Sequence, residues 1–366
     1  MSDGPAHTPP PAPDAAPPPP PANSLPNSAA PRRRRPRYSG KNPRRFEDKY
    51  KELDPARHAE TIAKVIASGK TPAGTHRPIM VAEVLEILAP RPGEIAADCT
   101  LGYGGHTREI LARLQPGGRL LGLDADPIEL PKTEARLRAL GYGPDTFTAH
   151  RSNYAGLRQV IMSAGLHGVD LLLADLGVSS MQIDDPARGF SVKHCGPLDM
   201  RMNPSRGQPA SVFLEKISTP ALAALLTENS DEPHAAAIAP MLAGHVFHTT
   251  TELAAAIRAA LRRIPEEEAT LSVRRVFQAL RIAINDEFSA LDTFLRALPS
   301  CLNPGARVAI LTFHSGEDRR VKKSFAAARA AGLYSAVSEE VVRPSLAEQG
   351  ANPRSAPTKL RWARRA

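Results

Sequence analysis

The chain has 366 residues, 42% of them hydrophobic, which is enough for one large or two ordinary domains with a substantial core. No apolar run approaches the roughly 18 residues of a membrane span, and the first residues lack the apolar segment of a secretory signal. The three cysteines lie far apart in the sequence, which argues against a disulfide framework. We therefore expect a protein of a reducing compartment, the cytoplasm.

The formal net charge of +9 lies at the two ends of the chain. Residues 1–50 contain nine Lys and Arg against four acids, residues 352–366 contain five and no acid, and the remainder is close to neutral. Basic ends of this kind favour a polyanion, most often nucleic acid, as the partner. A solubilising disordered tail explains the N-terminal end equally well.

Residues 1–48 are rich in Pro, Ala and Arg, which predicts a disordered arm. Further along, the sequence alternates between strand and helix patterns. Strands are predicted at residues 94–98, 119–124, 146–150 and 169–175, and helices at 81–88, 107–114 and 133–140. The strand at 169–175 is apolar nearly throughout, which is typical of a parallel strand covered on both faces. The alternation predicts a doubly wound α/β fold.

The alternation stops near residue 187. Only helical patterns follow, at residues 221–227, 234–242, 251–263 and 273–298, until residues 306–313 restore a buried strand. We expect a helical substrate-recognition subdomain at residues 187–298, inserted into a cofactor-binding domain formed by residues 49–186 and 299–366.

A Gly-rich turn follows the first predicted strand and opens a helix; it reads Asp98-Cys-Thr-Leu-Gly-Tyr-Gly-Gly-His106. Such a turn lets the backbone approach a ligand closely, and the helix N–H groups point at it. Asp124 ends the next strand, where a carboxylate can accept hydrogen bonds from two ribose hydroxyls. Together the two features predict a site for an adenosine-bearing cofactor.

Two cofactors fit these features, NAD and S-adenosylmethionine. The dinucleotide pattern requires a glycine at position 107, where this chain has Thr107. Asp98, just before the turn, suits an ammonium-bearing ligand better than a pyrophosphate. These residues therefore predict S-adenosylmethionine as the cofactor and a methyltransferase as the class of enzyme, rather than an NAD-dependent oxidoreductase.

Residues 175–190 and 196–202 resemble the family of small-subunit ribosomal RNA cytosine-N4 methyltransferases. Further blocks typical of that family occur in order at residues 76–79, 100–107, 123–127, 277–287, 313–322, 352–355 and 359–361. The resemblance covers about residues 76–365.

The resemblance implies a Rossmann-like class I methyltransferase sheet with an inserted helical domain. It also implies N4-methylation of a cytidine in the decoding (P-site) region of 16S rRNA, with the small ribosomal subunit as partner. No membrane and no metal are expected, and the family allows a homodimer. The cofactor contacts that it implies are Gly104, Gly105, His106, Asp124, Tyr154 (where the family usually has Phe), Asp175 and Gln182.

The exocyclic amine of cytosine is a poor nucleophile, so the protein must align it with the methyl donor and accept hydrogen bonds from it. Asp175 ends the fourth strand, where open α/β sheets place their ligands, and is predicted to orient the amine. A purely cofactor-binding role is the alternative. The base must leave its stack, and Phe190, Tyr154 or Phe313 could stack against it.

Charged residues in the resembling blocks, namely Asp184, Asp185, Arg188, Asp199 and Arg201, are predicted to form a salt-bridged loop, with gating of the base as the alternative. Three features depart from the family. Gly316 replaces Leu, residues 229–232 replace Gly-Glu-Glu, and Leu271 with Ser272 replaces His-Pro. They bear on the inserted domain and the RNA contacts. The alternative function is a non-catalytic small-subunit assembly or RNA-binding factor that retains the fold.

Overall fold

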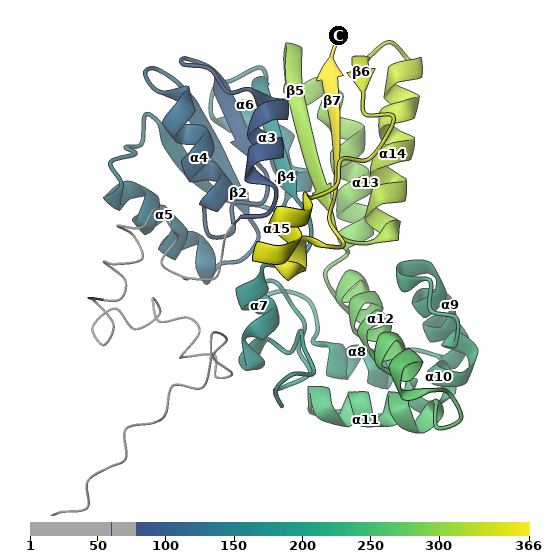
Figure 1. Cartoon of the computed structure of the whole chain (residues 1–366). Helices are drawn as coiled ribbons and strands as arrows, with labels where there is room; N and C mark the ends of the chain where they lie inside the picture. The colour runs from purple at the N-terminus through teal and green to yellow at the C-terminus, as the bar shows by residue number, and fades with distance from the viewer. Residues whose placement is uncertain (1–59, 61–77) are drawn as a thin grey trace, which may run out of the picture. The chain divides into compact units, whose positions relative to one another are not determined.

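The computed structural model describes residue 60 and residues 78–366, so the predicted arm at residues 1–48 lies outside the described residues. A seven-stranded sheet has the strand order β3-β2-β1-β4-β5-β7-β6 (Figure 1). Its strands are β1 (Ile95–Asp98), β2 (Arg119–Asp124), β3 (Phe147–Arg151), β4 (Val169–Asp175), β5 (Leu302–Thr312), β6 (Tyr334–Val337) and β7 (Lys359–Arg365). The strands β1 to β5 are parallel, and β7 is antiparallel to β5 and β6. The predicted α/β class is confirmed.

Helices connect and flank these strands. Those before β4 or after β5 are α3 (Val81–Leu88), α4 (Gly105–Leu114), α5 (Glu129–Ala139), α6 (Leu157–Ser163), α14 (Ser315–Ala330) and α15 (Leu346–Ala351). Those between β4 and β5 are α7 (Ser180–Asp184), α8 (Ala210–Lys216), α9 (Thr219–Ser230), α10 (Ala235–Leu242), α11 (Thr250–Ala260), α12 (Glu266–Ile284) and α13 (Glu287–Ala297). The short 3-10 helices are η2 (Tyr154–Gly156), η3 (Pro186–Arg188), η4 (Leu298–Cys301) and η5 (Pro353–Ser355).

Both faces of the sheet are covered, which explains the apolar run of β4. Leu172 and Ala174 pack on one face with side chains of α6, α13 and α14. Leu171 and Leu173 point to the other face and pack with α3, α4 and α5. Because successive strand residues face opposite sides, only a strand buried on both faces needs apolar residues at every position.

The helices α8 to α12 enclose a hydrophobic core of their own, with side chains from Phe190 to Leu280. The single helix predicted at residues 273–298 is wrong. The chain leaves α12 at Asn285 and turns at Asp286, which has a left-handed φ of 51°, before α13 begins. Leu291 and Phe294 of α13 then pack in the core of the sheet. The domain boundaries remain predictions, and this packing favours an insert that ends before α13.

The basic C-terminal end is part of the sheet. It forms β7, between β5 and β6. Arg361 is buried and pairs with Asp318, which Lys359 also contacts. Arg365 donates hydrogen bonds to the carbonyl oxygens of Pro299 and Leu333. These cations are therefore used within the fold.

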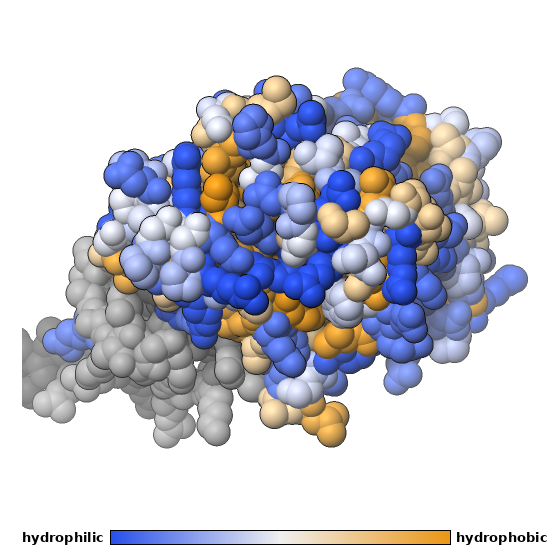
Figure 2. Space-filling view, turned by 90° about the horizontal axis from the view of Figure 1, so that it is seen from above, coloured by the Kyte–Doolittle hydropathy of each residue, from blue (hydrophilic) through white to orange (hydrophobic). Residues whose placement is uncertain are grey.

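Within residues 78–366, none of the helices combines the length and the apolar character that crossing a membrane requires. The face seen from the side where β7 ends carries mostly hydrophilic side chains, with hydrophobic ones scattered among them (Figure 2).

Candidate functional site

The predicted cofactor residues follow four neighbouring strands. Gly104, Gly105 and His106 follow β1, Asp124 ends β2, Tyr154 follows β3 and Asp175 ends β4. In the sheet these strands lie in the order β3-β2-β1-β4, with all four parallel. From β1 the chain adds β2 and β3 on one side and then continues with β4 on the other side of β1. Open α/β sheets bind ligands at such a change in strand order. The fold therefore brings these residues to one edge of the sheet.

The Gly-rich turn holds the start of α4 close to its neighbours. Gly104 has a φ of 74°, a left-handed conformation that favours glycine, and its N–H donates to the carbonyl of Leu101 at 2.7 Å. A Cβ atom on Gly105 would lie 2.4 Å from Cγ of Pro78. Thr133 of α5 donates to the carbonyl of Gly102 at 2.5 Å. The turn is thus fixed from both sides, at the start of a helix, where the first N–H groups lack partners within the helix.

Asp98 is held by donors within the turn, and its suitability for an ammonium-bearing ligand remains a prediction. Its side chain is buried, and its Oδ2 accepts a hydrogen bond from Thr107 Oγ1 at 2.6 Å. Its Oδ1 accepts from the Thr100 N–H at 3.1 Å. Burial raises the pKa of Asp98, against the lowering effect of these donors and of His106. The residue holds the turn onto β1.

Asp124 is held by two backbone donors. Its Oδ2 accepts from the Gly102 N–H and its Oδ1 from the Asp126 N–H, both at 2.8 Å. Burial raises its pKa to about 6, although the two N–H groups favour the charged form. Each oxygen keeps a lone pair for a further donor, as ribose recognition requires.

Asp175 lies on the other side of the turn. Its side chain is 26% exposed, and its Oδ2 is 3.8 Å from Nδ1 of His106. The Nε2 of His106 is 2.9 Å from the carbonyl oxygen of Ile79. Among the described residues, the buried Oδ1 of Asp175 has no hydrogen-bond partner. Burial raises the pKa of Asp175 to about 6; His106 lowers it, and Asp98 and Glu317 add to the rise.

Gln182 and Tyr154 contact the protein through their polar atoms. The amide of Gln182 donates to Asp126 Oδ2 at 2.7 Å and accepts from the Ser179 N–H at 2.8 Å. The hydroxyl of Tyr154 donates to the carbonyl of Glu287 at 3.2 Å, and its ring lies 5.5 Å from that of Phe294. Their roles toward the cofactor remain predictions.

The three aromatic candidates for stacking on a base lie in different surroundings. Phe190 is buried in the core of the helices. Tyr154 packs against Phe294 in the core of the sheet. Phe313 follows β5 and is only half-buried, beside Gly177 in the loop after β4. Of the three, Phe313 has the placement closest to the loop that follows Asp175.

The charged residues of the blocks after β4 are paired with protein groups. Arg201 makes a bidentate contact with Asp199, at 2.7 and 2.8 Å. Asp184 contacts Lys193 and Arg354. Asp185 accepts from the Ala187 N–H, and Arg188 pairs with Asp126 at 2.8 Å. Asp126 itself was not predicted, although the Asp-Pro step at residues 126–127 is a recognisable turn signal.

Two departures from the family pattern have structural counterparts. A Cβ on Gly316 would lie 2.6 Å from Cζ of Phe288, so the Phe288 ring occupies the space that a side chain at 316 needs. Ser272 is buried and donates to Glu232 at 2.9 Å, which joins two of the departing segments. Leu271 is exposed, and nothing in the structure explains it.

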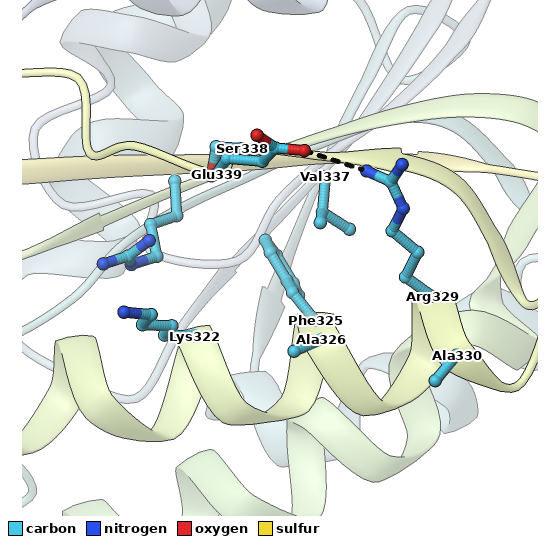
Figure 3. A pocket seen from close by; sticks show the side chains of 9 residues that line it. Lys322, Phe325, Ala326, Arg329, Ala330, Val337, Ser338 and Glu339 are labelled. Carbon is cyan, nitrogen blue, oxygen red and sulfur yellow. Dashed lines mark ion pairs between the residues drawn. The ribbon is translucent and has the colours of Figure 1, made fainter.

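A separate cavity of about 420 Å³ lies between α14 and the chain around β6 (Figure 3). Its lining includes Lys322, Phe325, Arg329 and Glu339, and none of the predicted site residues. In the described part of the chain, no three His, Cys, Asp or Glu side chains gather in a way that could hold a metal ion.

The strand ends fit S-adenosylmethionine. A helix N-terminus with free N–H groups suits a carboxylate, and Asp124 suits ribose hydroxyls. The buried Oδ1 of Asp175, which has no partner within residues 78–366, suits a nitrogen donor, because a buried acceptor without a partner is costly. Pyrophosphate does not fit as well, because both Asp124 and Asp175 face the same edge.

Comparisons with known proteins agree with this assignment. Residues 73–366 match the model of the MraW methylase family. A ribosomal RNA small subunit methyltransferase H 1 of Lachnoclostridium phytofermentans is 51% identical, over 90% of this chain and 92% of the relative. A ribosomal RNA small subunit methyltransferase H 2 of Alkaliphilus metalliredigens is 48% identical, over 93% of this chain and 99% of the relative. Both alignments must extend before residue 73 to cover so much of the chain. The chain belongs to the MraW methylase family.

Proposed function

We propose that this protein transfers a methyl group from S-adenosylmethionine to N4 of a cytidine in small-subunit ribosomal RNA, cytosine 1402 of 16S rRNA. The observation that carries the proposal is Asp175. It is a carboxylate at the ligand-binding edge of a methylase fold, with one buried oxygen to which no described residue donates a hydrogen bond. The amino group of cytosine is a donor of the required kind.

The cofactor supplies a methyl group on an activated sulfonium, so the protein's task is alignment. Gly104, Gly105 and the start of α4 hold its amino-acid end, and Asp124 holds its ribose. Tyr154 packs on the adenine, and Gln182 fixes the loop after β4. The ring of His106 contacts the Ile79 carbonyl through Nε2 and keeps the Asp175 carboxylate near the Gly-rich turn through Nδ1.

Asp175 orients the cytosine amine by accepting one of its N–H bonds. As positive charge develops on nitrogen during transfer, a carboxylate at this position is worth more than in water, because burial lowers the local dielectric. The role requires the ionised form. With a pKa of about 6, Asp175 is mostly ionised at neutral pH.

The decisive experiment is methyl transfer from labelled S-adenosylmethionine to small subunits that lack the modification. Mature subunits and naked 16S rRNA serve as the comparison substrates, and mass spectrometry of RNA fragments locates the methyl group. We expect label on one cytosine N4. Absence of transfer to all three substrates would exclude the enzyme and leave the non-catalytic assembly factor, which would still bind the subunit.

The protein is proposed to act in the cytoplasm, on the small subunit rather than at a membrane, and as a homodimer. The basic residues before residue 50 are proposed to contact RNA phosphates. Deleting residues 1–45 should then weaken RNA binding and flatten its dependence on salt, because fewer counterions are released. An unchanged salt slope would exclude that role.

A further inference from the structure

We propose that Arg188 is a positioning residue that makes the order of residues 199–202 depend on cofactor binding. The inference rests on the proposed function. It concerns a chain of contacts that runs from the ribose-binding carboxylate to a segment at the beginning of the helical insert.

The first part of the chain of contacts is Asp126. Its N–H donates to Asp124 Oδ1 at 2.8 Å, so a shift of the ribose-binding carboxylate changes the position of the Asp126 backbone. Its own side chain is 1% exposed. Oδ1 accepts from the Ile128 N–H at the start of α5, and Oδ2 accepts from Gln182 and Arg188. Asp126 thus joins the loop after β2 to the loop after β4.

The second part is Arg188, whose side chain is 9% exposed. Its Nη1 donates to Asp126 Oδ2 at 2.8 Å, and its Nη2 donates to the carbonyl oxygens of Arg201 and Met202, at 3.2 and 2.8 Å. One planar guanidinium therefore contacts the cofactor loop with one nitrogen and the insert with the other. Lysine cannot reproduce this geometry with its single nitrogen.

The third part is the segment that Arg188 contacts. Met200 is fully buried with a left-handed φ of 64°, a conformation that costs energy for a residue other than glycine. Asn285 holds the same segment from the opposite side, accepting from the Met202 N–H at 2.7 Å and donating to the Met200 carbonyl at 2.8 Å. Backbone hydrogen bonds also hold the segment, from the Met200 N–H to the Arg188 carbonyl at 3.1 Å and from the Ala210 N–H to the Asp199 carbonyl at 2.8 Å. The side chains of Arg188 and Asn285 add the contacts to the carbonyls and N–H groups of residues 200–202.

Arg188 therefore couples two groups that the reaction must align, the cofactor and the wall formed by the insert. If binding of ribose to Asp124 steadies Asp126, it also steadies the Arg188 contacts to residues 201 and 202. Coupling of this kind is reciprocal, so ordering of the segment by RNA would strengthen cofactor binding by the same factor.

The test compares Arg188→Lys with Arg307→Lys. Lysine at 188 keeps a positive charge beside Asp126, so the protein should fold. Arg307 is a matched control, because it is 12% exposed and contacts both oxygens of Glu94 at 2.7 Å, in the middle of β5 and just before β1. Hydrogen exchange of the amides at residues 199–203 is followed with and without S-adenosylmethionine, together with cofactor affinity, kcat and KM for the small subunit.

We expect S-adenosylmethionine to slow exchange at residues 199–203 in the wild type and in Arg307→Lys, but not in Arg188→Lys. Cofactor affinity of Arg188→Lys should stay within about threefold of wild type, while kcat/KM for the subunit falls roughly tenfold or more, in the range of typical coupling factors.

Three results would overturn the inference. Wild-type protein that binds the cofactor without slower exchange, or Arg188→Lys that keeps the protection, overturns it while the proposed function stands. A wild type that binds no S-adenosylmethionine overturns the proposed function and this inference together.

Discussion

The two halves of the ligand-binding edge treat their carboxylates differently. At the ends of β1 and β2, the oxygens of Asp98, Asp124 and Asp126 accept hydrogen bonds from protein donors. At the end of β4, Asp175 has an oxygen without a partner among the described residues and a histidine at 3.8 Å. The first half, which we call the holder, is formed by hydrogen bonds within the protein. The second half offers an acceptor to a donor from a ligand. Removing the charge of Asp175 should therefore raise stability and lower activity, whereas removing the charge of Asp126 should lower stability.

The largest effect is expected for Asp175→Asn. Loss of the negative charge on the acceptor that orients the amine should lower kcat by about 100-fold or more, as for other preorganised electrostatic groups. At pH 7.5 the variant should unfold at a higher temperature, because it removes a buried charge whose pKa is raised to about 6. A shift of about two pKa units corresponds to at most about 3 kcal/mol.

Asp126→Asn is the control from the other half of the edge. It should lower stability by about 1–3 kcal/mol, because Arg188 and Gln182 lose their charged acceptor. Thermal melts, turnover and cofactor titrations on both variants decide whether Asp175 orients the amine or only binds the cofactor. If Asp175→Asn loses cofactor affinity in parallel with turnover, Asp175 only binds the cofactor.

Gly105→Ala should have the next largest effect. The added Cβ would lie 2.4 Å from Pro78 Cγ, so either the turn or Pro78 must move. We expect a loss of about 1–3 kcal/mol of stability and a cofactor affinity lower by roughly tenfold. Gly143→Ala is the matched control, because nothing lies within 4 Å of its Cβ position. Equal cofactor affinity of both variants would show that the turn does not hold the cofactor.

The pH profile tests both halves together. Asp124 and Asp175 have pKa values of about 6 and act as acceptors in their ionised forms. The value of kcat/KM should therefore fall as the pH drops below about 6, by about tenfold or more per pH unit once both carboxyls are mostly protonated. Unfolding is not the cause, because carboxyls with raised pKa values stabilise the fold as they take up protons, between pH 6 and the ordinary value of 3.8. Circular dichroism at pH 5.5 should be unchanged; loss of the signal there would contradict this reading.

The sequence predicted the features that depend on local patterns. Period and composition located β4, and the glycines located the turn between β1 and α4. The strands β6 and β7 were not predicted, because the four Lys and Arg residues of β7 were interpreted only as part of a basic end that favours a polyanion. Lys359 and Arg361 pair with Asp318, and Arg365 donates to the carbonyl of Leu333; such distant partners leave no local signal in the sequence.

The site was predicted as a set of residues but not as a network. Asp124 and Asp175 stand at strand ends, where topology alone brings them together. Asp126 and Arg188 are 62 residues apart and meet only because the insert folds back onto the loop after β2. The break of the helix at Asp286 also escaped prediction, because its left-handed conformation is not specified by the residue type alone.

The smallest effect on activity is expected away from this edge, at Gly316 and Phe288. Gly316→Leu alone should cost about 1–3 kcal/mol, because the Phe288 ring lies where its side chain would go. Phe288→Leu alone should cost about as much, through the cavity that it leaves and the loss of the contact with the Arg320 guanidinium, 3.6 Å from the ring centre.

The double variant should recover at least about 1 kcal/mol of the summed cost, because each change makes room for the other. Chemical denaturation of the four proteins measures this coupling, and cofactor affinity should be the same in all of them. Additive losses would mean that the glycine at 316 is not matched to Phe288. Altered cofactor affinity would mean that the packing of α13 against α14 reaches the holder, and that the two halves of the edge are less independent than their hydrogen bonds indicate.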